Sequence, residues 1–118
     1  GVTTATPFRV GSMLACTWVD IPNPDPSVYN STTSPYAQGS ARGGMRFSRL
    51  EGAWWGNNSV FFDSTQGGRA GVGQVFRYIP FGANKGYLTL VYESPSANVL
   101  DAPDNLCVSP RGGIVLCE

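Results

Sequence analysis

The segment Asn58–Glu93 decides the fold, because it holds three β-like runs in a row. The runs are Ser59-Val-Phe-Phe-Asp63, Gln74-Val-Phe-Arg-Tyr78 and Tyr87-Leu-Thr-Leu-Val-Tyr-Glu93. Each is rich in β-branched and aromatic residues, and turn-forming stretches such as Gly67-Gly68 and Asn84-Lys-Gly86 separate them. Strands that follow one another through such turns commonly pair in space. The segment therefore predicts an antiparallel meander.

Short β-like runs also flank this segment on both sides. They are Met13–Val19, Leu106–Ser109 and Ile114–Cys117. The chain has 15 Gly and 9 Pro among its 118 residues, and helical periodicity is hard to find. We therefore predict an all-β fold of about five to seven short, mostly antiparallel strands, with almost no helix. Residues 20–44 are rich in Pro, Ser, Thr, Gly and Asn, and we expect a long, loop-rich excursion there.

The bulk composition excludes several classes of function. The chain is long enough for one small domain, and its 8 basic residues balance its 8 acidic ones. This balance lacks the basic excess of a nucleic-acid-binding protein, so we expect no nucleic-acid partner. No apolar run is long enough to span a membrane. The absence of histidine and of CxxC pairs excludes Ser-His-Asp triads, Cys-His dyads and the common zinc sites within this chain.

Two of the cysteines and the tandem tryptophans are predicted to be buried in the core. Three cysteines, an odd number, allow at most one disulfide. Cys107 and Cys117 lie in apolar β-like runs, so we expect both to be buried as small hydrophobic side chains. Trp54-Trp55 is more typical of core packing than of a surface on which a sugar or a base stacks.

Arg49 and Glu51 are the first candidates for a functional site. They are two residues apart, so on a strand their side chains leave the same face. An arginine forks onto phosphate oxygens, and a carboxylate holds a hard metal ion. The alternative is a surface salt bridge or a cross-strand ion pair. As site residues, they are expected to point into one concave centre together with Asp104.

Three further polar residues follow later in the chain. Asp104 and Asn105 come after Pro103, where a turn that starts a strand is the ordinary interpretation. As a functional group, Asp104 offers oxygen ligands at the start of a strand. Glu118 closes the apolar run Ile114–Cys117, and it either emerges into solvent or is held by a cation.

Read together, the motifs resemble the PhoX-type bacterial alkaline phosphatases. They occur in one order along nearly the whole chain, and the ordered set is far more specific than any single motif. The motifs are Trp18-Val-Asp-Ile-Pro-Asn-Pro-Asp-Pro26, Gln38-Gly-Ser-Ala-Arg-Gly-Gly44, Phe47-Ser-Arg-Leu-Glu-Gly-Ala-Trp54, Val60-Phe-Phe-Asp-Ser-Thr-Gln-Gly-Gly68, Gly73-Gln-Val-Phe-Arg-Tyr78, Leu88-Thr-Leu-Val-Tyr-Glu-Ser-Pro95, Leu100-Asp-Ala-Pro-Asp-Asn-Leu106 and Val108-Ser-Pro-Arg-Gly-Gly-Ile-Val-Leu-Cys-Glu118.

The resemblance implies a six-bladed β-propeller with a central site that holds ferric iron and calcium ions. It implies a phosphomonoester substrate and a location outside the cytoplasm, either periplasmic or secreted. Arg49 would hold the phosphate, Glu51 would be a metal ligand, and Asp104 would be a metal ligand or would support one. Asn105 and Glu118 would be further candidates for either of these last two roles.

The chain also departs from the family pattern. We find no match for the cysteine and the early glutamate that hold iron in the family, or for its late basic residue that helps to bind phosphate. The length suffices for about a blade and a half, with 58–93 as a blade meander and 104–118 as the start of the next blade. The last run stops at Glu118 without a turn, which suggests that the chain continues in a longer parent. We therefore expect residues 1–118 alone to have no phosphatase activity.

Two other functions stay open. The first is a small all-β module that self-assembles through its edge strands into oligomers or fibres, with carboxylates for structural calcium. The second is a carbohydrate-binding domain around Trp54-Trp55. The expected partners are accordingly a phosphomonoester, the remaining propeller blades, or other copies of this chain.

Overall fold

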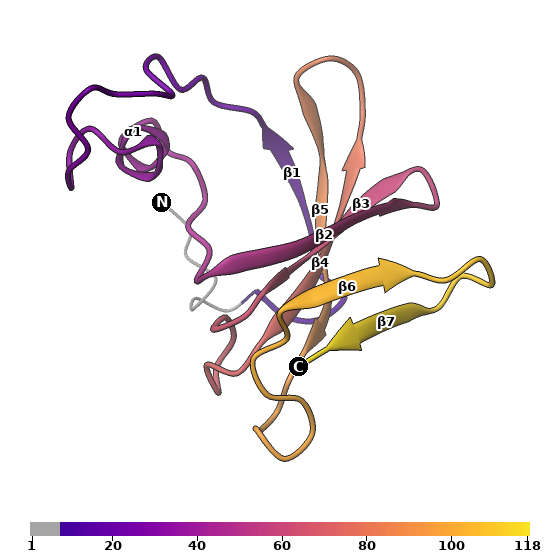
Figure 1. The fold of residues 1–118 in the computed structure, drawn as a ribbon. Coiled ribbons are helices and arrows are strands. Elements are labelled where there is room, and N and C mark those ends of the chain that lie inside the picture. Colours follow the sequence, from indigo (N-terminus) through magenta and orange to yellow (C-terminus); the bar gives the residue numbers. More distant parts are fainter. Residues whose placement is uncertain (1–7) are drawn as a thin grey trace.

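The computed structural model describes residues 8–118, which form seven strands and one short helix (Figure 1). These elements are β1 (Met13–Thr17), α1 (Pro35–Ala41), β2 (Leu50–Gly56), β3 (Ser59–Ser64), β4 (Gln74–Pro80), β5 (Lys85–Glu93), β6 (Asn105–Val108) and β7 (Ile114–Cys117). All strand pairs in this part of the chain are antiparallel. The predicted antiparallel, mostly β fold is therefore confirmed. No helix within residues 8–118 is long and apolar enough to cross a membrane.

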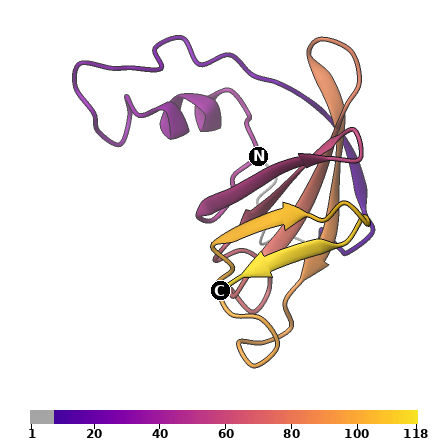
Figure 2. The same cartoon turned by 45° about the vertical axis from the view of Figure 1, so that its right-hand side comes forward.

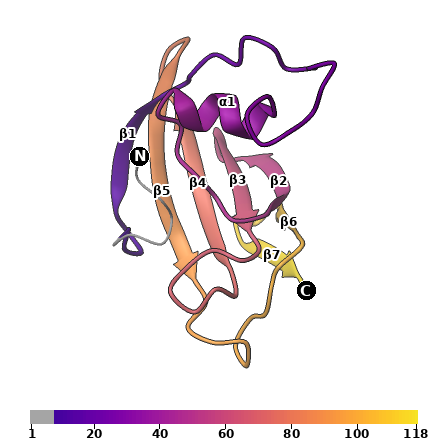
Figure 3. The same cartoon turned by 90° about the vertical axis from the view of Figure 1, so that its left-hand side faces the viewer.

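Five strands form one sheet in the order β1-β5-β4-β3-β2 (Figure 3). The strands β3, β4 and β5 are neighbours in space as they are in the chain, as the meander prediction requires. A tight hairpin joins β2 to β3, and its residues Asn57 and Asn58 both have positive φ angles, 51° and 55°. Asn tolerates this conformation, which matches the twist of the strands in a hairpin. At the opposite edge, β1 pairs with β5.

One face of the large sheet carries an aromatic core. Phe76 and Leu90 are fully buried there, and Leu88 and Phe8 pack with them. The ring of Phe76 stacks on that of Phe62, with 5.3 Å between the ring centroids. Side chains at alternate positions of β3, β4 and β5 build this face, since successive side chains of a strand leave opposite faces.

The other face of the large sheet packs against the hairpin β6–β7, which forms a second sheet (Figure 2). Phe61 and Val75 of the large sheet meet Leu106 of β6 in the buried centre of this interface. Asp63 lies two residues after Phe61 on β3, and its side chain is fully buried. A carboxylate is thus enclosed where the pattern of the strand calls for an apolar side chain.

The segment between β1 and β2 passes over one end of the large sheet and carries α1 (Figure 3). The helix begins after Ser34, whose Oγ accepts a hydrogen bond from the N–H of Ala37 at 3.2 Å, and Pro35 suits its first turn. Trp18 ties the segment to β4, because its Nε1 donates a hydrogen bond to the hydroxyl of Tyr78 at 2.8 Å. A largely apolar cavity of about 620 Å³ lies between this segment and the aromatic core.

Two expectations about buried side chains are wrong. Trp54 and Trp55 are 50% and 58% exposed, because β2 is the edge strand of the large sheet and has no neighbouring strand on its outer side. Cys117 is also exposed, since it lies in a two-stranded sheet that is covered on one face. Cys107 is half-buried, and neither of these cysteines forms a disulfide with the other or with Cys16.

We expect Cys16 to react with iodoacetamide at least about tenfold more slowly than Cys117 at pH 8 in the native protein. Burial raises the pKa of the Cys16 thiol, so less of the reactive thiolate is present at a given pH. Because the folded-state pKa is the higher one, the protonated thiol favours the fold below the unfolded pKa, and this contribution is lost as the pH rises through the folded value. Labelling followed by peptide mass spectrometry measures the rates. Equal rates for the two cysteines before denaturation would contradict the prediction.

Candidate functional site

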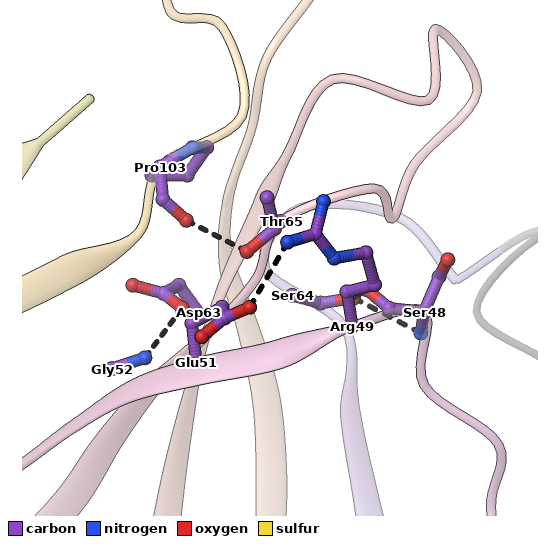
Figure 4. A network of polar contacts seen from close by, with 8 residues as sticks. All are labelled: Ser48, Arg49, Glu51, Gly52, Asp63, Ser64, Thr65 and Pro103. Carbon is purple, nitrogen blue, oxygen red and sulfur yellow. Dashed lines mark hydrogen bonds and ion pairs between the residues drawn. The ribbon is translucent and has the colours of Figure 1, made fainter.

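Arg49 and Glu51 form an ion pair at the start of β2 (Figure 4). Nη2 of Arg49 lies 3.2 Å from Oε1 of Glu51, and the two side chains are 54% and 40% exposed. The two residues share a side as expected, but for another reason than strand alternation, because Arg49 precedes the strand and has a φ of 53°. An exposed ion pair of this kind contributes little to stability. Because both side chains are partly exposed, both charged groups stay accessible to a ligand.

A β-bulge lies directly behind Glu51. The register of β2 against β3 shifts by one residue between Leu50 and Ala53. As a result Glu51 and Gly52 together face a single β3 residue, Asp63. Oδ1 of Asp63 accepts a hydrogen bond from the N–H of Gly52 at 2.9 Å. A bulge bends its strand and redirects its side chains, so this one sets the direction in which Glu51 leaves β2.

The start of β6 reaches β2 at the same point. A Cβ atom on Gly52 would lie only 2.7 Å from Cα of Asn105, so the close approach requires glycine. At the end of β3, Oγ1 of Thr65 donates a hydrogen bond to the carbonyl of Pro103 at 2.9 Å (Figure 4). Asp104 lies between Pro103 and Asn105 in the chain, so these two contacts hold it beside the end of β3.

Asp63 is a third carboxylate at this point, and sequence reasoning passes over it. The pKa of Asp63 is raised above its ordinary value, chiefly by burial. The charges of Glu51 and Asp104 also raise it, whereas the backbone N–H groups of Gly52 and Glu51 lower it. Its Oδ2 atom is buried without a hydrogen-bond partner among residues 8–118. We call Arg49, Glu51, Asp63 and Asp104 the carboxylate junction. The signal in the sequence was an Asp within an apolar strand, where Asp is disfavoured.

The other two predicted site residues use their side-chain oxygens locally. Oδ1 of Asn105 accepts a hydrogen bond from the N–H of Leu106 at 2.8 Å. Oε1 of Glu118 accepts one from the N–H of Asp101 at 3.1 Å. Asp104, Asn105 and Glu118 are all exposed. The roles of Asn105 and Glu118 as ligands remain predictions, and so does a concave centre shared with Arg49 and Glu51.

The oxygen atoms of the carboxylate junction have the chemistry of a calcium site but not the number. Calcium takes about six to eight oxygen ligands, chiefly from carboxylates, carbonyl groups and water. Within the part of the chain that the structure describes, no three acidic or cysteine side chains gather closely enough to hold a metal ion. Glu51 and Asp104 offer the carboxylate oxygens that calcium binds, but the described residues do not by themselves make up a calcium site, and nothing in their arrangement is specific for iron.

The chain matches a known protein family over its whole length. The model for the family described as alkaline phosphatase PhoX covers residues 1–118. No curated protein and no solved structure matches the chain at a significant level. The matched range includes every member of the carboxylate junction.

Proposed function

Because the chain belongs to the PhoX family of alkaline phosphatases, we propose that it is part of an extracytoplasmic phosphomonoesterase. The family match over residues 1–118 is the observation that carries this proposal, and it supports a phosphatase with a phosphate-ester substrate. We propose that the carboxylate junction is the share of the active site that this chain contributes. The proposed periplasmic or secreted location is supported by the family match alone and by no feature of the fold.

In this proposal Arg49 binds the phosphate group. Its guanidinium is half exposed, and among residues 8–118 it is held by one acceptor, Oε1 of Glu51. The other N–H groups of the side chain are left for a phosphate, which suits the forked geometry of arginine. Glu51 keeps the guanidinium oriented while its own carboxylate faces the same side. Binding and orientation of the ester are therefore assigned to one exposed pair.

Glu51 and Asp104 are the residues of this chain that we propose as metal ligands. Calcium and ferric ions, when bound, would supply positive charge opposite the charge that develops on the phosphoryl group. Asn105 and Glu118 are further candidates, and each would first have to give up its hydrogen bond to the chain. The remaining ligands are assigned to other parts of a longer protein, as is any iron ligand.

We also propose that β2 to β5 form one blade of a six-bladed β-propeller and that β6–β7 starts the next. Two observations support this. The strands β2, β3, β4 and β5 are adjacent in chain order and in space, as in a four-stranded blade. The hairpin β6–β7 forms a separate sheet that packs face to face against them, as neighbouring blades do. The pairing of β1 with β5 adds a strand that a blade does not need.

The full-length protein that carries this chain is expected to hydrolyse p-nitrophenyl phosphate, whereas residues 1–118 alone are not. The physical reason is that the carboxylate junction supplies too few ligands for a metal site. Release of p-nitrophenol by both proteins is measured with calcium and ferric iron present. An inactive full-length protein would overturn the phosphatase proposal, and turnover by the isolated chain would overturn the shared site. Large, inactive assemblies of both proteins in light scattering would favour the self-assembly alternative.

A further inference from the structure

We propose that Asp63 is a positioning residue for Glu51: it holds the β2 bulge and so sets where the Glu51 carboxylate stands relative to Asp104. The inference rests on the proposed function, because it assumes that Glu51 acts in the active site. Asp63 itself is fully buried and touches no substrate in this assignment. It acts through the backbone of β2.

The burial of Asp63 calls for such a role. Its neighbours on the same face are Phe61 and Val75, which pack against Leu106 between the two sheets. Enclosing a carboxylate among such side chains opposes folding, and an apolar residue of similar size would serve packing better. The Oδ2 atom is buried without a hydrogen-bond partner among residues 8–118, so half of the carboxylate's bonding capacity is unused there. What the side chain does provide is an acceptor for β2.

That acceptor lies at the one place where β2 loses its regular register. Gly52 and Glu51 share Asp63 as their opposite residue, so the β3 backbone cannot satisfy both of them in the usual ladder. The carboxylate accepts the N–H of Gly52 at 2.9 Å instead. This bond fixes the bulge at Gly52 and not one residue earlier or later. The position of the bulge decides which face of the sheet each β2 side chain points to, and so it decides the direction of Glu51.

The same bond controls the distance between β2 and β6. Gly52 lies against Asn105, and a bulge that moved along β2 would bring a larger residue to this contact. Glu51 precedes Gly52 and Asp104 precedes Asn105, so the two exposed carboxylates flank the contact that the bulge creates. The side chain of Glu51 has one side-chain partner within the described residues, Arg49, which is itself exposed. The backbone bulge is therefore what fixes Glu51 in place.

Three variants of the full-length protein test this inference. Asp63→Ala removes the acceptor, Asp63→Asn keeps an oxygen that accepts the N–H of Gly52, and Ser59→Ala is the matched control. Ser59 is fully buried on the same strand, but its Oγ accepts from Nε of Arg77 at the far end of β3. Activity on p-nitrophenyl phosphate, thermal stability, and hydrogen exchange of peptides that cover residues 50–56 are measured for each variant.

We expect Asp63→Ala to lower kcat about 30- to 100-fold, because displacement of a reacting group by about 1 Å has effects of this size. Asp63→Asn should keep activity within about threefold of the wild type. Ser59→Ala should keep activity within about twofold of the wild type, although it loses about as much thermal stability as Asp63→Ala. Hydrogen exchange in peptides covering residues 50–56 should be at least about tenfold faster in Asp63→Ala and unchanged in the other two variants. The reason is that the hydrogen bond to Asp63 protects the amide of Gly52.

Equal activity losses in Asp63→Ala and Ser59→Ala would overturn the inference, since they would indicate general destabilisation. Failure of Asp63→Asn to restore activity would also overturn it, because the N–H acceptor is the proposed device. If the wild type has no phosphatase activity, the proposed function fails, and the exchange measurement still decides whether Asp63 holds the bulge. Unchanged exchange in Asp63→Ala would show that it does not.

Discussion

In the full-length protein, Glu51→Gln is expected to lower kcat/KM for p-nitrophenyl phosphate by at least about 100-fold. The substitution keeps the size of the side chain and an oxygen that Arg49 can bind, but it removes the negative charge that a metal ion needs. Changing a residue that merely supports a metal ligand commonly costs about 10- to 100-fold, so changing a ligand itself should cost no less. The fold should be unaffected, because the side chain is 40% exposed and its ion pair contributes little to stability.

The matched control is Asp25→Asn, which removes the same charge from an exposed position in the segment between β1 and α1. It should retain activity to within about twofold. Steady-state kinetics, thermal unfolding and the metal content of each purified protein are measured together. If the Glu51→Gln variant keeps more than about a tenth of the activity and its full metal content, the assignment of Glu51 to the active site is wrong.

Gly52→Ala is expected to destabilise the protein by about 3 kcal/mol and to lower kcat/KM at least about 30-fold. The added Cβ would lie 2.7 Å from Cα of Asn105, 2.8 Å from the backbone nitrogen of Leu106 and 2.8 Å from Oδ2 of Asp63. Two of these three atoms belong to the backbone and cannot rotate away, so β6 has to move from β2. That movement separates Asp104 from Glu51, and the loss of activity should therefore exceed what reduced stability explains.

Gly113→Ala is the control for this prediction. Gly113 precedes β7 in the hairpin turn, and a Cβ there would meet Oγ of Ser109 at an ordinary 3.7 Å. The stability and activity of this variant should match those of the wild type. Urea unfolding gives the free energies, and initial rates at a temperature at which both variants are folded give the activities. A Gly52→Ala protein with wild-type kinetics would mean that the β2–β6 contact does not position the site.

Much of the β architecture could be predicted because it depends on local features. The alternation of apolar residues in the runs that became β3, β4 and β5, and the turn residues between them, act over short distances along the chain. The exposure of Trp54 and Cys117 could not be predicted in this way. An apolar residue in a strand is buried only if another element covers that face, and the edge position of β2 and the two-stranded hairpin decide this coverage. The helix α1 was also missed, because it is short and lies in a segment rich in turn-forming residues.

The sequence by itself determined the antiparallel strands, the family, and the candidates Arg49, Glu51 and Asp104, since strand pattern and ordered motifs can be read along the chain. Only the tertiary structure showed that Asp63 joins them. Its place depends on a one-residue shift in register and on the packing of β6 against Gly52, and both bring together residues far apart in sequence. Such contacts form between elements that are distant in the sequence, so their contribution to stability cannot be read from any single run of residues.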